Sequence, residues 1–201
     1  TNSDLVYNDD GYIEVDKNGN VAVKDDYMDD IYLGSVFPKY NLAWRNDFNY
    51  KGINLGVLFT ARIGGICYSA TQANMDLYGV SEASAAARDA GGVMINGRDM
   101  IDAQKWYQVI GSQSGLPQYY TYSATNVRLQ ELSLGYTLPS KWFRDKMRMT
   151  VSFVGRNLWM IYCKAPFDPE AVASTGMNYQ GIDYFMMPSM RNLGFNVKFQ
   201  F

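Results

Sequence analysis

The chain has 201 residues, of which 47% are hydrophobic and 19% are charged, and its formal net charge is −2. This composition excludes an intrinsically disordered chain, and the lack of a basic excess gives no electrostatic support for nucleic-acid binding. The sequence contains no histidine, so the commonest general base and the commonest metal ligand are both missing.

The first predicted feature lies in residues 1–38, ahead of the first strand. The stretch "DKNGNVAVKDD" carries oxygen-bearing side chains at alternate positions, which is the spacing of a calcium-binding loop. Val21 stands where such a loop has its turn glycine, and Tyr27 stands where it has its last acidic ligand. The sequence therefore leaves two readings open, a solvated acidic turn and a calcium site. The ligands of that site would be Asp16, Asn18, Asn20 and Asp26.

The next segment predicts a β-hairpin. Residues 39–50 alternate between two faces, with Tyr40, Leu42, Trp44, Phe48 and Tyr50 on one of them. "KG" follows as a turn of hairpin length, and residues 53–66 alternate in the same way. A period of two is the signature of extended strands with one apolar and one polar face.

A long connection, residues 67–126, separates this hairpin from the next strand. "SEASAAARDAGG" at 81–92 predicts a short helix, with Ser81 as its N-cap and Gly91 as its stop. The same connection is rich in aromatic residues, which suit sugar stacking or a protein interface and equally suit plain loop packing. These candidate ligand or partner residues are Trp106, Tyr107, Tyr119, Tyr120 and Tyr122.

Three further strands are predicted at 127–138, 146–159 and 192–201, with a second long connection at 160–191. Asp168 and Glu170 in that connection are a carboxylate pair in sequence only, because Pro169 between them favours a tight turn. Without histidine, no Ser-His or Cys-His arrangement is possible. We therefore do not expect the chain to be an enzyme. Cys67 and Cys163 give neither a disulfide framework nor metal-ligand spacing, and two unpaired thiols are the favoured reading.

Connection lengths alternate between short and long, so that all the tight turns lie at one end of the predicted sheet. Short periplasmic turns and long extracellular loops are typical of outer-membrane β-barrels, and strands of about 9–11 residues are what such a barrel needs. Aromatic residues also gather near both ends of the strands, as at the two interfaces of a membrane. We predict an all-β fold, an antiparallel transmembrane β-barrel. Residues 1–38 would be an extracellular loop segment, and 39–201 would supply barrel strands.

Five strands cannot close a barrel of this class, for which about eight is the minimum. We therefore expect the sequence to be the C-terminal part of a larger protein. The alternatives are a soluble or surface carbohydrate-binding β-sandwich and a small structural barrel element. A sandwich explains the alternation equally well but explains neither the strand lengths nor the asymmetry of the connections.

Several short motifs, in this order and spacing, resemble the SusC/RagA family of TonB-dependent outer-membrane transporters of Bacteroidota. They are Gly34 with Pro38 before the first strand, Arg128 to Pro139 ("RLQELSLGYTLP"), Gly155 to Leu158 ("GRNL"), Asp168 to Glu170 ("DPE"), and Tyr184 with Pro188 before the last strand.

The resemblance implies the last five strands of a plugged barrel of about 22 strands. It also implies import of oligosaccharides or peptides across the outer membrane of a Gram-negative bacterium. The implied partners are a SusD-like surface lipoprotein acting as a lid, outer-membrane lipid, and the TonB complex, which would act through a region N-terminal to this sequence. The barrel-assembly machinery of such proteins recognises a C-terminal aromatic strand. Here that signal would be Phe195, Val197, Phe199 and Phe201. No cofactor is implied, apart from calcium on the surface loop.

Overall fold

This computed structural model describes residues 3–25, 31–112, 115–144, 146–173, 176 and 179–200. The chain forms two compact units, each built from three separate segments. The sheet unit comprises Val36–Ile66, Ser123–Ala171 and Met187–Phe201. The loop unit comprises Thr1–Ser35, Cys67–Tyr122 and Val172–Met186. The segments of the two units therefore alternate along the sequence. The sequence analysis predicted instead a single boundary between residues 38 and 39.

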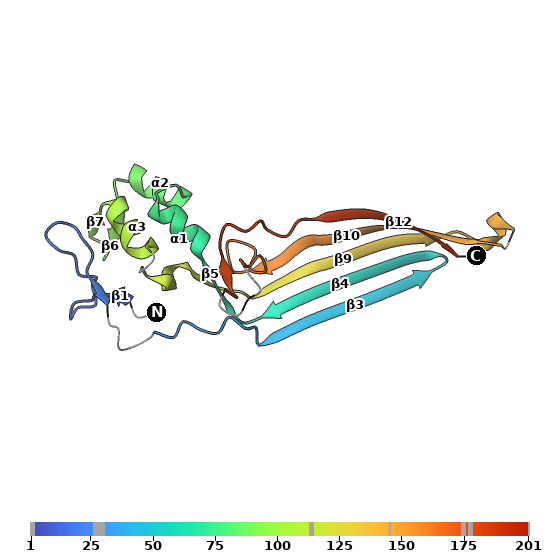
Figure 1. The fold of residues 1–201 in the computed structure, drawn as a ribbon, viewed down its shortest axis with the longest axis horizontal. Coiled ribbons are helices and arrows are strands. Elements are labelled where there is room, and N and C mark those ends of the chain that lie inside the picture. Colours follow the sequence, from blue (N-terminus) through green and yellow to red (C-terminus); the bar gives the residue numbers. More distant parts are fainter. Residues whose placement is uncertain are drawn as a thin grey trace. The chain divides into compact units, whose positions relative to one another are not determined.

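The elements follow in chain order (Figure 1). The strands are β1 (Ser3–Leu5), β2 (Val23–Asp25), β3 (Tyr40–Tyr50), β4 (Ile53–Ile63), β5 (Ile66–Ser69), β6 (Val93–Ile95), β7 (Asp99–Ile101), β8 (Thr121–Ser123), β9 (Asn126–Thr137), β10 (Arg148–Cys163), β11 (Ile182–Asp183) and β12 (Asn192–Gln200). The helices are α1 (Ala70–Leu77), α2 (Glu82–Asp89), α3 (Ala103–Gly111) and the 3₁₀ turns η1 (Pro117–Tyr120) and η2 (Ser140–Phe143). None of the helices in the described ranges combines the length and hydropathy of a membrane-spanning helix.

The sheet unit is one antiparallel layer of five strands in the order β12-β10-β9-β4-β3 (Figure 1). These are the five predicted strands, and their short and long connections alternate as predicted. The tight turn between β3 and β4 is Lys51-Gly52, where both residues have positive φ, 48° and 88°. That backbone twist matches the twist of the flanking strands, and a Cβ on Gly52 would lie only 2.8 Å from the carbonyl oxygen of Thr137.

Two strand ends differ from the sequence prediction for local reasons. β4 ends at Ile63 rather than at 66, because Gly64 and Gly65 take φ of 84° and 83°, which an extended strand does not accommodate. β10 continues to Cys163 rather than ending at 159, because an irregularity between Arg156 and Trp159 interrupts the alternation without ending the pairing.

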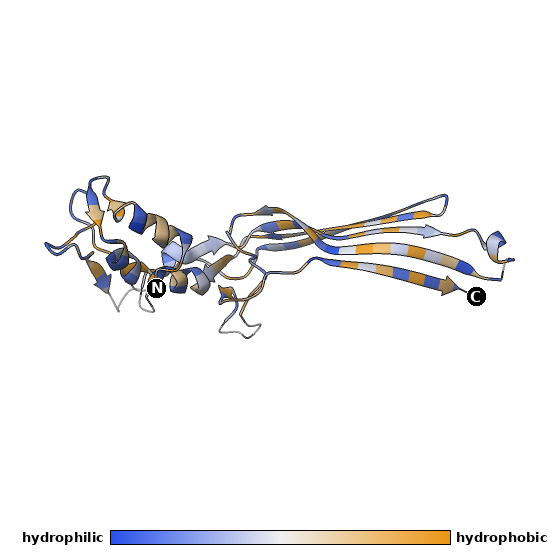
Figure 2. Cartoon of the chain, turned by 90° about the horizontal axis from the view of Figure 1, so that it is seen from above, coloured by the Kyte–Doolittle hydropathy of each residue, from blue (hydrophilic) through white to orange (hydrophobic). Residues whose placement is uncertain are grey.

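The register aligns apolar side chains in rows across all five strands. Phe48 pairs with Leu55, Leu55 with Leu134, Leu134 with Phe153, and Phe153 with Phe195. Figure 2 shows the alternation of apolar and polar positions along the strands that produces these rows. One face of the sheet is therefore apolar across its whole width, and the opposite face is polar.

The loop unit has its own hydrophobic core, to which residues far apart in sequence contribute. Leu5 and Val21 from the N-terminal segment pack with Trp106, Ile110 and Leu116 from the long connection. The side chain of Asn96 joins the same two segments, because its Oδ1 accepts from the N–H of Ile13 at 2.8 Å and its Nδ2 donates to the Ile13 carbonyl at 2.9 Å.

A third segment joins the loop unit through Ser69, the N-cap of α1. Its Oγ accepts from the N–H of Gln72 at 3.1 Å and donates to Oδ2 of Asp183 at 2.8 Å, and both side chains are buried. β11 runs parallel to β5 at this point, with Ile182 opposite Tyr68. The predicted helix at 81–92 is also present as α2, with Ser81 as its N-cap and Gly91 at φ 83° just after its end.

Candidate functional site

The apolar face of the sheet unit is exposed. In the row described above, Phe48 is 58% exposed, Leu134 55%, Phe153 51% and Phe195 70%. A soluble β-sandwich would bury these side chains under a second sheet. Among the described residues the sheet unit contains a single layer, so the sandwich alternative is not what the chain forms.

The polar face carries ion pairs and hydrogen bonds that run from strand to strand. Arg45 on β3 and Arg156 on β10 both approach Glu131 on β9, with N–O distances of 3.6 and 3.1 Å. Exposed pairs of this kind each contribute about 0–1 kcal/mol. These ion pairs indicate that this face of the sheet contacts water.

A chain of neutral hydrogen bonds crosses the same face nearer the tight turns. Asn49 donates to Asn54 at 2.7 Å, Asn54 donates to Thr137 at 2.9 Å, and the hydroxyls of Thr137 and Thr150 are 3.0 Å apart. These side chains come from four successive strands of the sheet. The polar face is thus continuous across the unit.

Exposed aromatic residues lie at both ends of the strands, as predicted. Tyr40 and Trp159 lie toward the long-connection end, and Tyr50 and Trp142 lie toward the tight-turn end, all with more than half of their surface exposed. Rings at both edges of an apolar band suit the two interfaces of a membrane.

The predicted assembly residues Phe195, Val197 and Phe199 all lie on the apolar face of β12, opposite Phe153, Val151 and Met149. All three are exposed. Phe201, the fourth residue of the signal, lies outside the described residues. Among the described residues β12 pairs on one side only, with β10.

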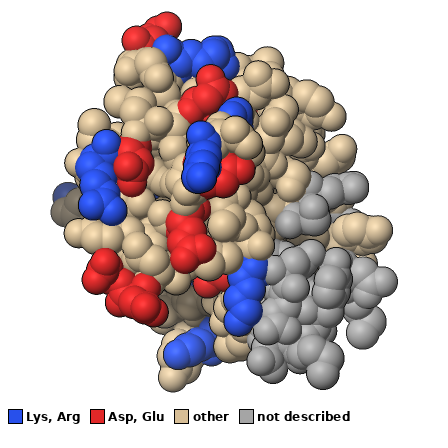
Figure 3. Space-filling view, turned by 90° about the vertical axis from the view of Figure 1, so that its left-hand side faces the viewer, with Lys and Arg blue, Asp and Glu red and all other residues tan. Residues whose placement is uncertain are grey.

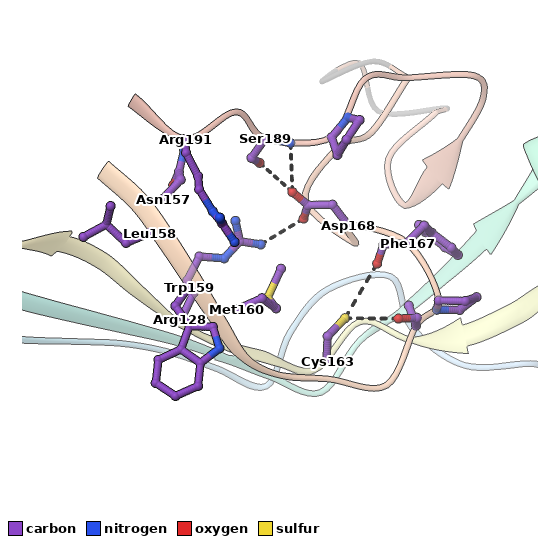
Figure 4. A pocket seen from close by; sticks show the side chains of 13 residues that line it. Arg128, Asn157, Leu158, Trp159, Met160, Cys163, Phe167, Asp168, Ser189 and Arg191 are labelled. Atoms are coloured by element: carbon purple, nitrogen blue, oxygen red, sulfur yellow. Dashed lines mark hydrogen bonds and ion pairs between the residues drawn. The ribbon is translucent and has the colours of Figure 1, made fainter. Parts of the chain in front are cut away.

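A buried ion pair lies where β9 and β10 meet the second long connection. Nη2 of Arg128 is 2.9 Å from Oδ1 of Asp168, and the two side chains are only 4% and 8% exposed. Oδ2 of Asp168 accepts from the hydroxyl and the N–H of Ser189 at 2.6 and 3.1 Å (Figure 4). Oδ1 also accepts from the N–H of Glu170 at 3.0 Å. The carbonyl of Asp168 accepts from the N–H of Ala171 at 3.1 Å, which is the tight turn expected around Pro169.

Asn157 completes this strand-end network. It has φ 51°, its Oδ1 accepts from Nε2 of Gln130 at 2.8 Å, and its Nδ2 donates to the carbonyl of Met190 at 3.2 Å. Asparagine tolerates positive φ better than most residues, and its side chain bonds locally. The network therefore ties β9, β10 and the approach to β12 together.

Hydrogen bonds keep Asp168 ionised. Burial by itself would raise the pKa of this carboxyl, but the bonds from Ser189, from the N–H of Glu170 and from Arg128 outweigh it and hold the pKa below its ordinary value. The pairing of Arg128 with Asp168 is thus between two charged groups.

The network encloses one side of a cavity of about 390 Å³. Its lining includes Arg128, Trp159, Phe167, Asp168 and Arg191. This volume is at the lower end of the range of about 300–1,000 Å³ that is usual for ligand pockets.

No model of a protein family matches the chain. A curated relative, TonB-dependent receptor P3 of Formosa agariphila, is 25% identical over 198 residues, which is 94% of this chain and 19% of that protein. Over nearly its whole length the chain is therefore similar to a TonB-dependent receptor. The SusC/RagA resemblance predicted from the motifs is confirmed.

Solved structures of RagAB agree on the fold. The RagAB peptide importer in the closed-closed state matches with a TM-score of 0.57 and 19% identity, over 94% of this chain and 20% of that chain. In the open-open state the TM-score is 0.64 with 16% identity, over 99% and 22%. The RagAB peptide transporter gives 0.59 with 17% identity, over 94% and 21%. The chain thus spans about a fifth of the length of these relatives.

The motifs that indicated the TonB-dependent receptor family come together in the strand-end network. Arg128, Asn157 and Asp168 each belong to a different motif, and Pro188 immediately precedes Ser189. Sequence reasoning treated them as separate strand and turn signals. Only the pairing of a buried arginine with a carboxylate 40 residues away reveals that they form one structure.

The aromatic residues proposed for ligand or partner contact separate into two groups. Trp106 and Tyr120 are core residues, 8% and 2% exposed, and therefore offer no free ring face. Tyr107 and Tyr122 are half-buried, and Tyr122 donates to Gln72 at 2.6 Å. Tyr119 is the most exposed of the five, and its ring meets Trp106 edge-on at 5.9 Å. The prediction that Trp106 and Tyr120 contact a ligand or partner is therefore wrong, because both side chains are buried.

The calcium hypothesis concerns the turn around Asp16. Its carboxylate accepts from the N–H groups of Asn18 and Asn20 and from Nδ2 of Asn20, each at 2.8 Å. The two bonds from Asn20 are the main reason why the pKa of Asp16 is below its ordinary value. Nζ of Lys105 donates to the carbonyl of Asn18. The described residues contain no group of three or more acidic or thiol ligands, and Asp26 lies outside them. Calcium at this turn stays a prediction.

Neither Cys67 nor Cys163 takes part in a disulfide bond. The thiol of Cys163 contacts the carbonyl oxygens of Ala165 and Phe167 at 3.4 and 3.6 Å, and that of Cys67 contacts the carbonyl oxygen of Tyr122 at 3.6 Å. Both act as small packing residues.

In the view of Figure 3, acidic and basic side chains are interspersed, so neither sign forms a continuous patch on that face.

Proposed function

We propose that this chain forms C-terminal wall strands and surface loops of a TonB-dependent importer in the outer membrane of a Gram-negative bacterium of the Bacteroidota type. The observation that supports this most strongly is the single-layer sheet with an exposed apolar face across five strands and a hydrogen-bonded polar face opposite. In the proposal the apolar face meets lipid and the polar face meets an aqueous lumen.

Both outer strands of the sheet require partners in this setting. β3 and β12 each present one unpaired edge among the described residues. Each unpaired N–H or C=O in the hydrocarbon costs several kcal/mol, so an open edge does not persist there. We therefore propose that further strands of the complete protein close the barrel, to a total of about 22, as the family resemblance implies.

The proposed cargo is an oligosaccharide or a peptide, and peptides are favoured because RagAB, whose solved structures share this fold, is a peptide importer. A SusD-like lipoprotein would lid the barrel. The TonB complex would drive import through a region N-terminal to this sequence. The proposal assigns no catalytic role to the chain.

Transport can be tested in cells that carry the complete gene or a deletion of it. We expect the full-length protein in the outer-membrane fraction, co-purification of a SusD-like lipoprotein, and uptake of fluorescent oligopeptides that is lost in the deletion strain and restored by the gene. Oligosaccharide uptake measured in the same strains separates the two cargo classes. Full-length protein recovered without detergent in the soluble fraction would contradict the proposal.

Deleting Phe201 tests the assembly signal. We expect outer-membrane insertion of the full-length protein to fall several-fold, because the machinery that assembles such barrels would lose the aromatic residue that follows β12 in the sequence. The measurement is the folded fraction in outer membranes, from the mobility of unheated samples in gel electrophoresis. Gln200→Ala, on the polar face of the same strand, is the matched control. Unchanged insertion after the deletion would show that Phe201 is not part of a signal.

A further inference from the structure

Two arginines line the strand-end cavity, and they differ in how they are neutralised. Nη2 of Arg128 is held by Asp168, and Nε donates to Oδ1 of Asn126 at 3.3 Å. Within the described ranges Nη1 of Arg128 makes no hydrogen bond, and the side chain of Arg191 makes neither a hydrogen bond nor an ion pair. Figure 4 shows the side chain of Arg191 extending toward the guanidinium of Arg128.

The carboxylate that pairs with Arg128 has no capacity left for a second arginine. Asp168 accepts two hydrogen bonds on each oxygen, from Arg128 and Glu170 N–H on Oδ1 and from Ser189 on Oδ2. Two oxygens offer about four acceptor positions, so these four donors fill them. Glu170 lies 3.4 Å from Nη2 of Arg128, on the side already occupied by Asp168. Within the described ranges no carboxylate forms an ion pair with Arg191, whose side chain is exposed and lines the cavity.

We propose that this cavity binds the oxyanion group of a solute, of the carboxylate or phosphate type. Guanidinium groups present planar, parallel N–H donors that match two oxygens of such a group, and a charged acceptor makes these bonds about twice as strong as neutral ones. The 96% burial of the Arg128 side chain keeps competing water away from one side of the site. Phe167 adds apolar surface for the remainder of the ligand.

The route of entry favours a dissolved anion over a lipid headgroup. Arg128 on β9 pairs with Thr60 on β4 and Met160 on β10. A bulge at Gln130 adds one residue to β9, so that Arg128 and Glu131, three positions apart, both lie on the polar face of the sheet. Under the proposed function that face meets the aqueous lumen, so this step rests on the proposed function. The ligand class is then the acidic group of a cargo molecule, such as a peptide carboxylate.

The test uses the full-length protein purified in a non-ionic detergent, titrated with inorganic phosphate at low ionic strength in a calorimeter. We expect Arg191→Gln to weaken the binding of phosphate about ten- to a hundredfold. Lys51→Gln, which removes a cation at the tight turn of β3 and β4, is expected to leave it unchanged. Equal phosphate affinities of wild type and Arg191→Gln, or no saturable binding by the wild type, would overturn the proposal.

A second arm separates the two sources of the anion and the two proposals. Phosphate binding is repeated in nanodiscs of phosphatidylcholine and of phosphatidylglycerol; selective loss in phosphatidylglycerol means that a headgroup occupies the cavity and overturns the assignment to a solute. Gel mobility of unheated samples shows whether Arg191→Gln is folded. Absence of the wild-type protein from outer membranes would contradict the proposed function, whereas the phosphate titration of purified protein does not depend on that result.

Discussion

Replacing Asp168 with alanine is expected to destabilise the full-length protein by about 3–5 kcal/mol. The substitution leaves the guanidinium of Arg128 buried without its main partner, and it removes the acceptor that holds the hydroxyl and N–H of Ser189. Removing one member of a buried pair costs more than the pair itself contributes, because the remaining charge still bears its desolvation penalty. The measurement is the midpoint of urea unfolding in detergent.

Glu170→Gln is the matched control, since Glu170 also approaches Arg128 but at 3.4 Å and with 38% of its side chain exposed. We expect a loss within about 1 kcal/mol. A double variant, Arg128→Met with Asp168→Leu, removes both charges and should be less destabilised than Asp168→Ala. A loss below about 1 kcal/mol for Asp168→Ala would show that the strand-end network does not hold β12 in place.

The same carboxylate predicts a loss of stability in acid. Its pKa is lowered in the folded protein, so its contribution is fully present above the ordinary value of 3.8 and disappears as the pH falls through the folded value. Below pH 3.8, the free energy of unfolding of Asp168→Ala should therefore change less with pH than that of the wild type.

Placing a charge on the apolar face is the second large effect. Phe48→Arg is expected to destabilise the protein by about 2–4 kcal/mol if the site lies near the bilayer midplane, and by less toward the interface. Phe48 is at the end of the cross-strand row that contains Leu55, Leu134, Phe153 and Phe195. In lipid, the guanidinium there has no water and no partner.

Asn49→Arg is the matched control, because it is the next residue on the same strand and lies on the polar face. It loses one hydrogen bond to Asn54, at a cost of about 1 kcal/mol. Both variants are compared by insertion into outer membranes and by unfolding in lipid bilayers. If Asn49→Arg were the more damaging of the two, the assignment of the faces to lipid and lumen would be reversed.

The strands and their faces could be predicted because the signal is local. Alternation along residues 39–50 or 192–200 depends only on neighbouring positions, and an extended chain converts it directly into two faces. The ends of β4 and β10 were less accurate, since Gly64-Gly65 and the irregularity near Asn157 act through backbone conformation rather than through hydropathy.

The aromatic residues of the first long connection show the limit of composition. Trp106 and Tyr119 are of the same residue class and thirteen positions apart, yet one is buried in the core and the other is partly exposed. Trp106 is buried because it shares a core with Leu5 and Val21, about a hundred residues earlier in the sequence, and no local pattern encodes such contacts.

The sequence by itself determined the five strands, their apolar and polar faces, the tight turns and the family resemblance, because each of these depends on short-range periodicity or on motifs of a few residues. Only the tertiary structure decided that three distant segments fold into one loop unit. It also decided that Arg128, Asn157, Asp168 and Ser189 form a single network at a cavity that Arg191 lines. The physical reason is that burial and ion pairing depend on which segments meet in space, and those meetings join residues from 21 to 114 positions apart.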